Sequence, residues 1–398
     1  MQGLKPATSV PRHGTRGTAA IPEWDPRAPE VVADQYQAYD RMRRRCAVAY
    51  SDYLQYSVFR HADVVRVLMD PGTFSNNVSA RVAIPNGMDP PRHGAYRSLI
   101  DGYFSPEAMA RFAPACRALC DELAAQLPRS GEFEVMAALA YPFAVRAQCA
   151  FLGWGPGLHA PLNEWIQKKN AATLSGNPYV NAAVALEFDQ TIRRQLELGR
   201  QAGADPARDL TARLLDEEVG GRKLQEEEIV SILRNWTVGE LATIAASVGI
   251  LLHYLAAHPA IQDRLRANPH LIGAANDEIL RIRAPLIANR RVVVQPVRLG
   301  GFQFKAGDRL TLIWASANRD EAVFGDPDEF RLDRDPALNL LYGAGIHACP
   351  GAPLARLELR CIVESLLAAG GRFAAAGTAA PVMAAYPTGG FSRVSVCR

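Results

Sequence analysis

The sequence predicts a mainly α-helical fold with a smaller β lobe. Apolar residues recur at helical spacing through most of residues 106–283, whereas residues 291–314 contain short β-branched runs separated by turn residues. The 398 residues are 48% hydrophobic and 21% charged, which supplies enough apolar material for a large core. Because no linker rich in Pro, Gly or Ser divides the chain, we expect a single domain over 1–398, with an irregular segment over about 1–30.

The N-terminal part is expected to alternate between helices and strands. The pattern predicts helices over 36–45 and 61–69, and paired strands over 47–50 and 56–59. Residues 73–88 contain turn formers without a period, which is typical of a loop or broken helix that contacts ligands. The next helix starts after two prolines, and His93 and Arg97 lie four residues apart on one of its faces. A solvated basic face is the alternative for this pair.

Helical patterns dominate the middle of the chain, over 106–127, 137–152, 160–172, 181–203, 210–218 and 226–257. The break at 175–178 predicts a mobile connection that could act as a lid. The most apolar run, 241–257, is shorter than a typical membrane span and contains His253, so we interpret it as part of a buried core helix. The first thirty residues lack the apolar core of a signal peptide, and we expect neither a membrane anchor nor a membrane partner.

The centre of the longest helix has an unusual composition. Gly239 lowers helix propensity by about 1 kcal/mol relative to alanine, and Thr243 is placed to donate its hydroxyl to the Gly239 carbonyl and bend the helix. Glu240 shares the face of Thr243 one turn earlier. A tolerated glycine and an acid at the rim of the helix are the alternative interpretation.

The last third predicts the β lobe and a framed cysteine. We expect a helix over 276–283 with an ion pair between Glu278 and Arg281, a short helix over 317–321, and strands over 291–294, 297–299, 302–304 and 309–314. The tail, 381–396, is expected to form a hairpin around two glycines at 389–390.

Cys349 lies on a glycine-rich stretch, 340–351, followed by a helical pattern over 352–369. Glycines permit a tight loop in which backbone amides point toward the sulfur, which is how a soft metal ligand can be presented. A buried free cysteine near a turn is the alternative. The seven cysteines show no pairing pattern, which indicates a reducing cytosol, and Cys116 and Cys120 are expected in the core. The net charge of +3 is spread along the chain and gives no reason to expect nucleic acid as a partner.

Together and in order, these motifs resemble the bacterial cytochrome P-450 family of haem-thiolate monooxygenases. The family's aromatic-Gly-x-Gly-x-His-x-Cys-x-Gly loop matches 342–351, with Tyr342 where phenylalanine is usual. Its Glu-x-x-Arg helix matches 278–281, its His-x-x-x-Arg helix matches 93–97, and its later strand and turn segments match 299–308 and 317–327. The resemblance covers the chain from about residue 30 to its end.

The resemblance implies a cytochrome P-450 fold with haem b between the long central helix and the cysteine-loop helix. It implies that Cys349 is the axial thiolate ligand of the haem iron and that the haem propionates are held by four residues, His93, Arg97, Arg291 and His347. The Glu278–Arg281 pair becomes an internal structural ion pair, joined by Arg319 or a neighbour.

The same resemblance makes Thr243 and Glu240 the candidate catalytic residues. The family's threonine falls on Thr243, but Ala242 stands where an acid is usual, and Glu240 occupies the place of a small residue. We hypothesise that Thr243 bends the helix and organises a water, and that Glu240 relays protons or binds a polar group of the substrate.

The expected activity is insertion of one atom of O2 into a small or medium organic substrate, by hydroxylation or oxidative dealkylation. Electrons would come from a ferredoxin and a ferredoxin reductase, docking near Arg92, Arg356 and Arg360. A peroxide-driven oxygenase and a non-catalytic haem-based ligand binder are the alternatives. We expect a cytoplasmic monomer. By the resemblance, the substrate pocket would be lined by 76–84, 165–179, 238–242, 286–289 and the tail near Thr388.

Overall fold

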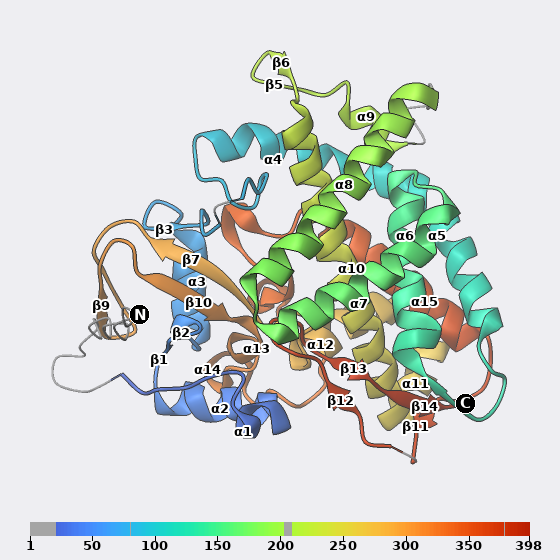
Figure 1. Ribbon diagram of the computed structural model, residues 1–398. Coiled ribbons are helices and arrows are strands. Elements are labelled where there is room, and N and C mark those ends of the chain that lie inside the picture. Colours follow the sequence, from blue (N-terminus) through green and yellow to red (C-terminus); the bar gives the residue numbers. More distant parts are fainter. Residues whose placement is uncertain (1–20, 80, 203–208, 378) are drawn as a thin grey trace, which may run out of the picture.

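The computed structural model describes residues 21–79, 81–202, 209–377 and 379–398. Helices form most of it, and a mixed sheet lies along one side (Figure 1). The predicted fold class, mainly α with a smaller β lobe, is confirmed. Of the predicted irregular segment, 1–20 lies outside the described residues, and 21–28 contains no helix.

The helices lie close to the predicted ranges. They are α1 (Pro29–Ala33), α2 (Gln35–Arg45), α3 (His61–Met69), α4 (Arg92–Tyr103), α5 (Pro106–Gln126), α6 (Tyr141–Leu152), α7 (His159–Ser175), α8 (Pro178–Ala202), α9 (Leu210–Leu214), α10 (Glu226–Ala257), α11 (Pro259–Ala267), α12 (Ile272–Ile282), α13 (Trp314–Ala317), α14 (Glu321–Phe324) and α15 (Ala352–Ala368). A π-helical turn, η1 (Met136–Ala140), leads into α6, and the 3₁₀ turns η5 (Leu340–Tyr342) and η6 (Gly345–His347) lie in the cysteine loop.

The main sheet has the order β1-β2-β10-β7-β3, with β2 and β10 parallel and the other pairs antiparallel. Its strands are β1 (Val48–Ser51), β2 (Gln55–Val58), β3 (Phe74–Ser75), β7 (Ala288–Val293) and β10 (Arg309–Ile313). Smaller sheets are formed by β4 (Glu132–Glu134), β5 (Glu218–Val219), β6 (Arg222–Lys223), β8 (Val297–Leu299), β9 (Phe302–Phe304), β11 (Ala374–Ala375), β12 (Val382–Met383), β13 (Phe391–Arg393) and β14 (Ser395–Cys397). The predicted tail hairpin is confirmed as β12 and β13.

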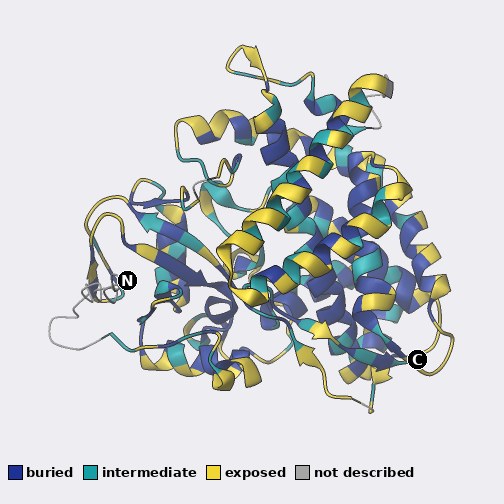
Figure 2. Cartoon of the chain, in the orientation of Figure 1, coloured by how far each residue is buried: buried dark blue, intermediate teal, exposed yellow. Residues whose placement is uncertain are grey.

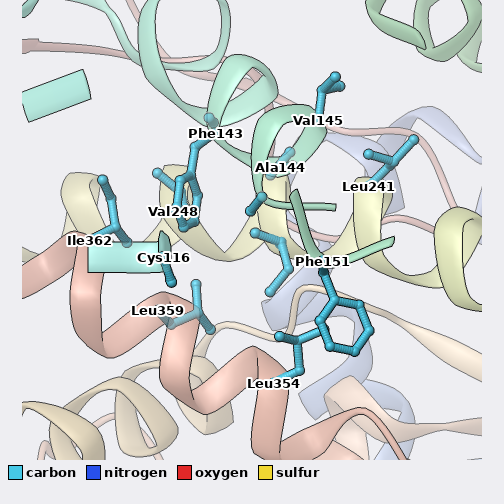
Figure 3. Packing of buried hydrophobic residues seen from close by; sticks show 14 of the residues in the cluster. Cys116, Phe143, Ala144, Val145, Phe151, Leu241, Val248, Leu354, Leu359 and Ile362 are labelled. Carbon is cyan, nitrogen blue, oxygen red and sulfur yellow. The ribbon is translucent and has the colours of Figure 1, made fainter. Parts of the chain in front are cut away.

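Helix α10 runs through the helical core. It is long and apolar enough to cross a membrane, but 61% of its most apolar window is buried inside the protein, as expected of a core helix. Figure 3 shows Val248 of this helix between Phe143 of α6 and Ile362 of α15. Figure 2 shows that buried residues lie at the centre of the helical part and that many exposed residues lie along α8. Cys116 and Cys120 are buried, as predicted.

The predicted ion pair between Glu278 and Arg281 is present and buried, with its N–O distance at 2.8 Å. Arg334 joins it, with its Nε 3.0 Å from Glu278. Arg319, which was the first candidate for this third position, instead pairs with Asp40 at 2.7 Å. Glu278 cannot pair with every nearby arginine, and Arg319 pairs with the buried Asp40 of α2 instead.

Three predicted helices have different bounds. No helix covers 317–321, because α13 ends at Ala317 and Asp320 begins α14 by accepting a hydrogen bond from the backbone of Ala322. Helix α9 ends before 218, because the chain there turns into the hairpin of β5 and β6. Helix α8 starts earlier than predicted, and residue 203, its predicted end, lies outside the described residues.

Candidate active site

The cysteine loop is shaped by two glycines with left-handed backbone angles. Gly343 has φ +72° and Gly345 has φ +70°, a region that L-residues rarely adopt. A Cβ atom at Gly345 would also overlap the backbone carbonyl of Leu68. The loop therefore lies directly against the end of α3, and it delivers Cys349 to the N-terminus of α15.

Backbone amides surround the sulfur of Cys349. Burial raises the pKa of the thiol, while the N–H groups of Gly351 and Ala352 and the nearby Arg97 oppose this shift by favouring the thiolate. The predicted arrangement of amides around the sulfur is thus present. Cys349 nevertheless keeps accessible surface. Among the described residues, no three His, Cys, Asp or Glu side chains lie close enough to hold a metal ion.

Two histidines from distant parts of the chain face each other next to this loop. The rings of His93, on α4, and His347, in η6, have centroids 4.5 Å apart. The Nε2 atoms of both are buried and have no hydrogen-bond partner among the described residues. Arg97 Nη1, one turn along α4, donates to the carbonyl oxygens of Ile346, at 3.1 Å, and Ala348, at 2.5 Å. These contacts join α4 to the cysteine loop.

Arg291, on β7, completes this cluster. It is only 2% exposed, and among the described residues no carboxylate forms an ion pair with it. Burial lowers its pKa to about 10, and the nearby Asp89 only partly offsets this. Burial, with His93 and Arg291 close by, also lowers the pKa of His347 to about 4. The four predicted residues thus lie together: Arg291 is buried without an ion-pair partner among the described residues, whereas Arg97 pairs with Asp101 at 2.7 Å.

A second feature is the centre of α10. The Thr243 hydroxyl donates to the Gly239 carbonyl at 2.7 Å, which confirms the predicted bond. Gly239 is exposed and a Cβ atom there would meet nothing within 4 Å, although the helix on both sides is buried. The stretch 238–243 therefore presents an accessible face inside the core.

Glu240, in the same stretch, interacts with Glu358 on α15. Burial raises the pKa of both carboxyl groups, and the Glu240 charge raises that of Glu358 further. The groups interact without an aligned hydrogen bond, since both Glu358 oxygens are buried and unpartnered among the described residues. Sequence reasoning missed Glu358, although an acid between Leu357 and Leu359 on an apolar helix was a usable signal.

The three arginines expected to meet a redox partner have different environments. Arg92 is exposed at the start of α4. Arg356 lies over the Tyr342 ring and binds Asp277 at 2.9 Å. Arg360 lies 3.9 Å from Glu364 on its own helix. Arg356 and Arg360 are thus half-exposed but already have acidic neighbours.

Known proteins resemble the chain along most of its length. The family model described as "Cytochrome P450" matches residues 179–369. The erythromycin C-12 hydroxylase of Saccharopolyspora erythraea is 31% identical over 347 residues, which are 83% of this chain and 86% of the relative. The linalool 8-monooxygenase of Pseudomonas putida is 26% identical over 86% of this chain and 91% of its own length. The structure of cytochrome P450 CYP109Q5 from Chondromyces apiculatus has 29% identity and a TM-score of 0.84, covering 95% of this chain and 98% of that one.

Proposed function

Since the chain belongs to the cytochrome P450 family of haem-dependent monooxygenases, we propose that it inserts one oxygen atom into an apolar organic substrate of small or medium size. Haem b, when bound, supplies the iron centre at which O2 is activated. Two relatives are named as a hydroxylase of erythromycin and a monooxygenase of linalool, so their names suggest hydroxylation of an organic molecule.

The observation that carries the proposal is a thiol that accepts from backbone amides, close to a buried arginine, Arg291, that has no ion-pair partner among the described residues. Cys349 would hold the iron. His93, Arg97, Arg291 and His347 would hold the two haem propionates, and the two unpartnered histidine Nε2 atoms support this assignment. Carboxylates would restore the interactions that desolvation removes from these groups.

We propose that protons reach the site through Glu240 and Glu358 rather than through the position of Ala242. Glu240 lies one turn before Thr243 and interacts with a second acid, and burial raises the pKa of both carboxyl groups, which favours a shared proton. Thr243 already donates to Gly239, so its oxygen is left to accept a hydrogen bond. Because Glu240 faces Glu358, its position supports a proton role better than a substrate contact.

The relay is tested by changing one acid at a time. Glu240→Gln and Glu358→Gln should each increase the fraction of reducing equivalents lost as hydrogen peroxide, with little change in substrate affinity. Glu364→Gln, on the same helix but paired with Arg360 and Arg117 instead, is the matched control. If coupling in both relay variants matched the control, the two acids would have no role in proton supply.

The activity itself is tested by spectrum and turnover. The reduced carbon-monoxide complex should show the red-shifted band of a thiolate ligand, and Cys349→Ser should remove it. Product formation should require O2 and an added ferredoxin and ferredoxin reductase. Turnover that peroxide supports better than this pair would favour a peroxide-driven oxygenase, which the alanine at 242 also suggests. If no bound ligand caused the protein to consume reductant, a non-catalytic haem-based ligand binder would be favoured.

The remaining assignments follow from the same proposal. Electrons would come from separate redox proteins, with the acidic ferredoxin docking beside Arg92, Arg356 and Arg360. The protein would act as a cytoplasmic monomer built as one domain. A loss of reduction rate in Arg92→Glu that disappears at high salt would support this docking site.

A further inference from the structure

A chain of aromatic rings leads from the cysteine loop toward the surface. At its inner end, a Cβ atom at Gly351 would lie 3.8 Å from the Phe104 ring and 3.9 Å from the Cys349 sulfur, so both adjoin this glycine. The centroids of the Phe104 and Trp236 rings are 5.3 Å apart, and those of the Trp236 and Tyr103 rings are 5.1 Å apart. The three rings are therefore in contact, and they come from α10 and from the end of α4.

The outer end of this chain is a tyrosine bound to a carboxylate. The Tyr103 hydroxyl donates to Glu217 Oε1 at 2.9 Å, although Tyr103 as a whole is buried. The side chain of Glu217 is 25% exposed, and Arg213 Nε lies 3.1 Å from the same oxygen. A phenol gives up its proton when it loses an electron, so a buried tyrosine can be oxidised only beside an aligned base. Glu217 is such a base, and its exposure lets it exchange protons with solvent.

Packing alone does not account for the indole in the middle of the chain. The Nε1 atom of Trp236 is buried and has no hydrogen-bond partner among the described residues, whereas a buried tryptophan usually finds one. Such an unpartnered donor costs free energy that a phenylalanine, with similar ring contacts, would avoid. Tryptophan and tyrosine lose one electron far more easily than phenylalanine does. Trp236 therefore adds to the chain an oxidisable group between Phe104 and Tyr103.

Two other sets of oxidisable rings lack part of this arrangement. Tyr342 lies in the cysteine loop itself, but its hydroxyl is buried and has no aligned hydrogen-bond partner in the part of the chain that the structure describes. Trp24 and Tyr39 form a similar pair, with centroids 5.7 Å apart, but they belong to the separate core of the β lobe. The first lacks an aligned base, and the second lacks the contact with Gly351.

From this geometry we propose that Trp236 and Tyr103 carry electrons from the surface to the haem when hydrogen peroxide oxidises it in the absence of substrate. The proposal rests on the proposed function, because it needs a haem held by Cys349. Peroxide takes two electrons from the haem site and, with two protons from solvent, is reduced to water. Tyr103 replaces each electron by way of Trp236, and its phenolic proton passes to Glu217. A soluble one-electron reductant such as ascorbate then restores Tyr103, and Glu217 returns the proton. The route protects the haem from peroxide that leaks from uncoupled turnover.

The first test traps the radical. The holoenzyme without substrate would be mixed with hydrogen peroxide, frozen within milliseconds and measured by electron paramagnetic resonance. The wild type should give a tyrosyl signal that narrows when ring-deuterated tyrosine is incorporated. Tyr103→Phe should remove the signal, whereas Tyr342→Phe and Tyr39→Phe should leave it unchanged. Glu217→Gln should weaken it several-fold because an amide is not a base, while Arg213→Gln, which keeps the carboxylate, should retain it.

The second test measures the protection itself. In excess peroxide the Soret band should bleach several times faster in Trp236→Phe than in Trp24→Phe, since phenylalanine is not readily oxidised. Ascorbate should slow the bleaching of the wild type and have much less effect in Trp236→Phe and Tyr103→Phe. Haem content and the carbon-monoxide spectrum, recorded before peroxide is added, show that each variant is folded.

Three results would overturn the route: no tyrosyl signal in the wild type, a signal that survives in Tyr103→Phe, or equal bleaching in Trp236→Phe and Trp24→Phe. If the carbon-monoxide complex of the wild type lacked the thiolate band, the proposed function would fail, whereas a normal band with any of these results would reject the route alone. If Trp236→Phe did not fold, Glu217→Gln would decide instead, because its side chain is partly exposed and an undiminished tyrosyl signal there would also reject the route.

Discussion

Replacing Gly345 with alanine should separate the cysteine loop from α3. Gly345 has φ +70°, which costs a residue with a Cβ about 1–2 kcal/mol. The added Cβ would also overlap the Leu68 carbonyl oxygen, and relieving such crowding typically costs a further ~1–3 kcal/mol. Because a backbone carbonyl cannot rotate away as a side chain can, the loop itself must move. We expect a total loss of about 2–5 kcal/mol in the free energy of unfolding. The accompanying displacement should be concentrated in the loop at Cys349.

Gly131→Ala provides the matched control. Gly131 has φ +92°, and a Cβ there would meet nothing within 4 Å, so this variant has the dihedral cost alone. Denaturant titration of both variants should therefore give a clear difference in stability. Haem content per protein and the height of the thiolate band should fall in Gly345→Ala and stay normal in Gly131→Ala. Equal stability losses, with full haem content in both, would refute the claim that the contact with Leu68 positions the cysteine loop.

Three other substitutions test separate parts of the structure. Hydrogen bonding from Arg222 holds the pKa of Glu228 at about 2, below its ordinary 4.5, so the stabilisation is complete above about pH 4.5 and is lost as the pH falls toward 2. Glu228→Gln should therefore cost ~2–3 kcal/mol near neutral pH and almost nothing near pH 2, as measured by denaturant titration across this range; a difference independent of pH would contradict the linkage. Arg281→Met leaves Glu278 buried with fewer partners and should lower the free energy of unfolding by ~3–5 kcal/mol, checked by thermal unfolding. Thr243→Val should change stability by less than ~1 kcal/mol, since its hydrogen bond is exposed, but it should increase the loss of electrons as peroxide; unchanged coupling would remove Thr243 from the proton route.

The features that sequence predicted well are local ones. The bond from Thr243 to Gly239 and the Glu278–Arg281 pair both follow from helical spacing, because residues three or four apart share a face. The helices themselves were found for the same reason. The bounds of α9 were wrong because two residues of β-pairing at 218–219 leave almost no periodic signal.

Contacts between distant segments could not be predicted from the sequence. His93 and His347 were each assigned to the propionates, but nothing in the chain indicates that their rings touch. The interaction of Glu240 with Glu358 depends on how α10 crosses α15, which helical periodicity does not determine. Arg319 illustrates the same limit, since several buried acids were available and only the packing of α2 selects Asp40.

The distribution of buried charge separates the framework from the ligand sites. Burial opposes the charge of Arg319, yet its pKa is raised because Asp328 and Asp40 form hydrogen bonds with it. Arg291 is equally buried but has a lowered pKa, since no carboxylate of the described chain forms an ion pair with it. The fold thus supplies anions to arginines that hold it together, such as Arg319, whereas Arg291 has no ion-pair partner among the described residues. Under the proposed function, the haem propionates would supply the negative charge that Arg291 lacks.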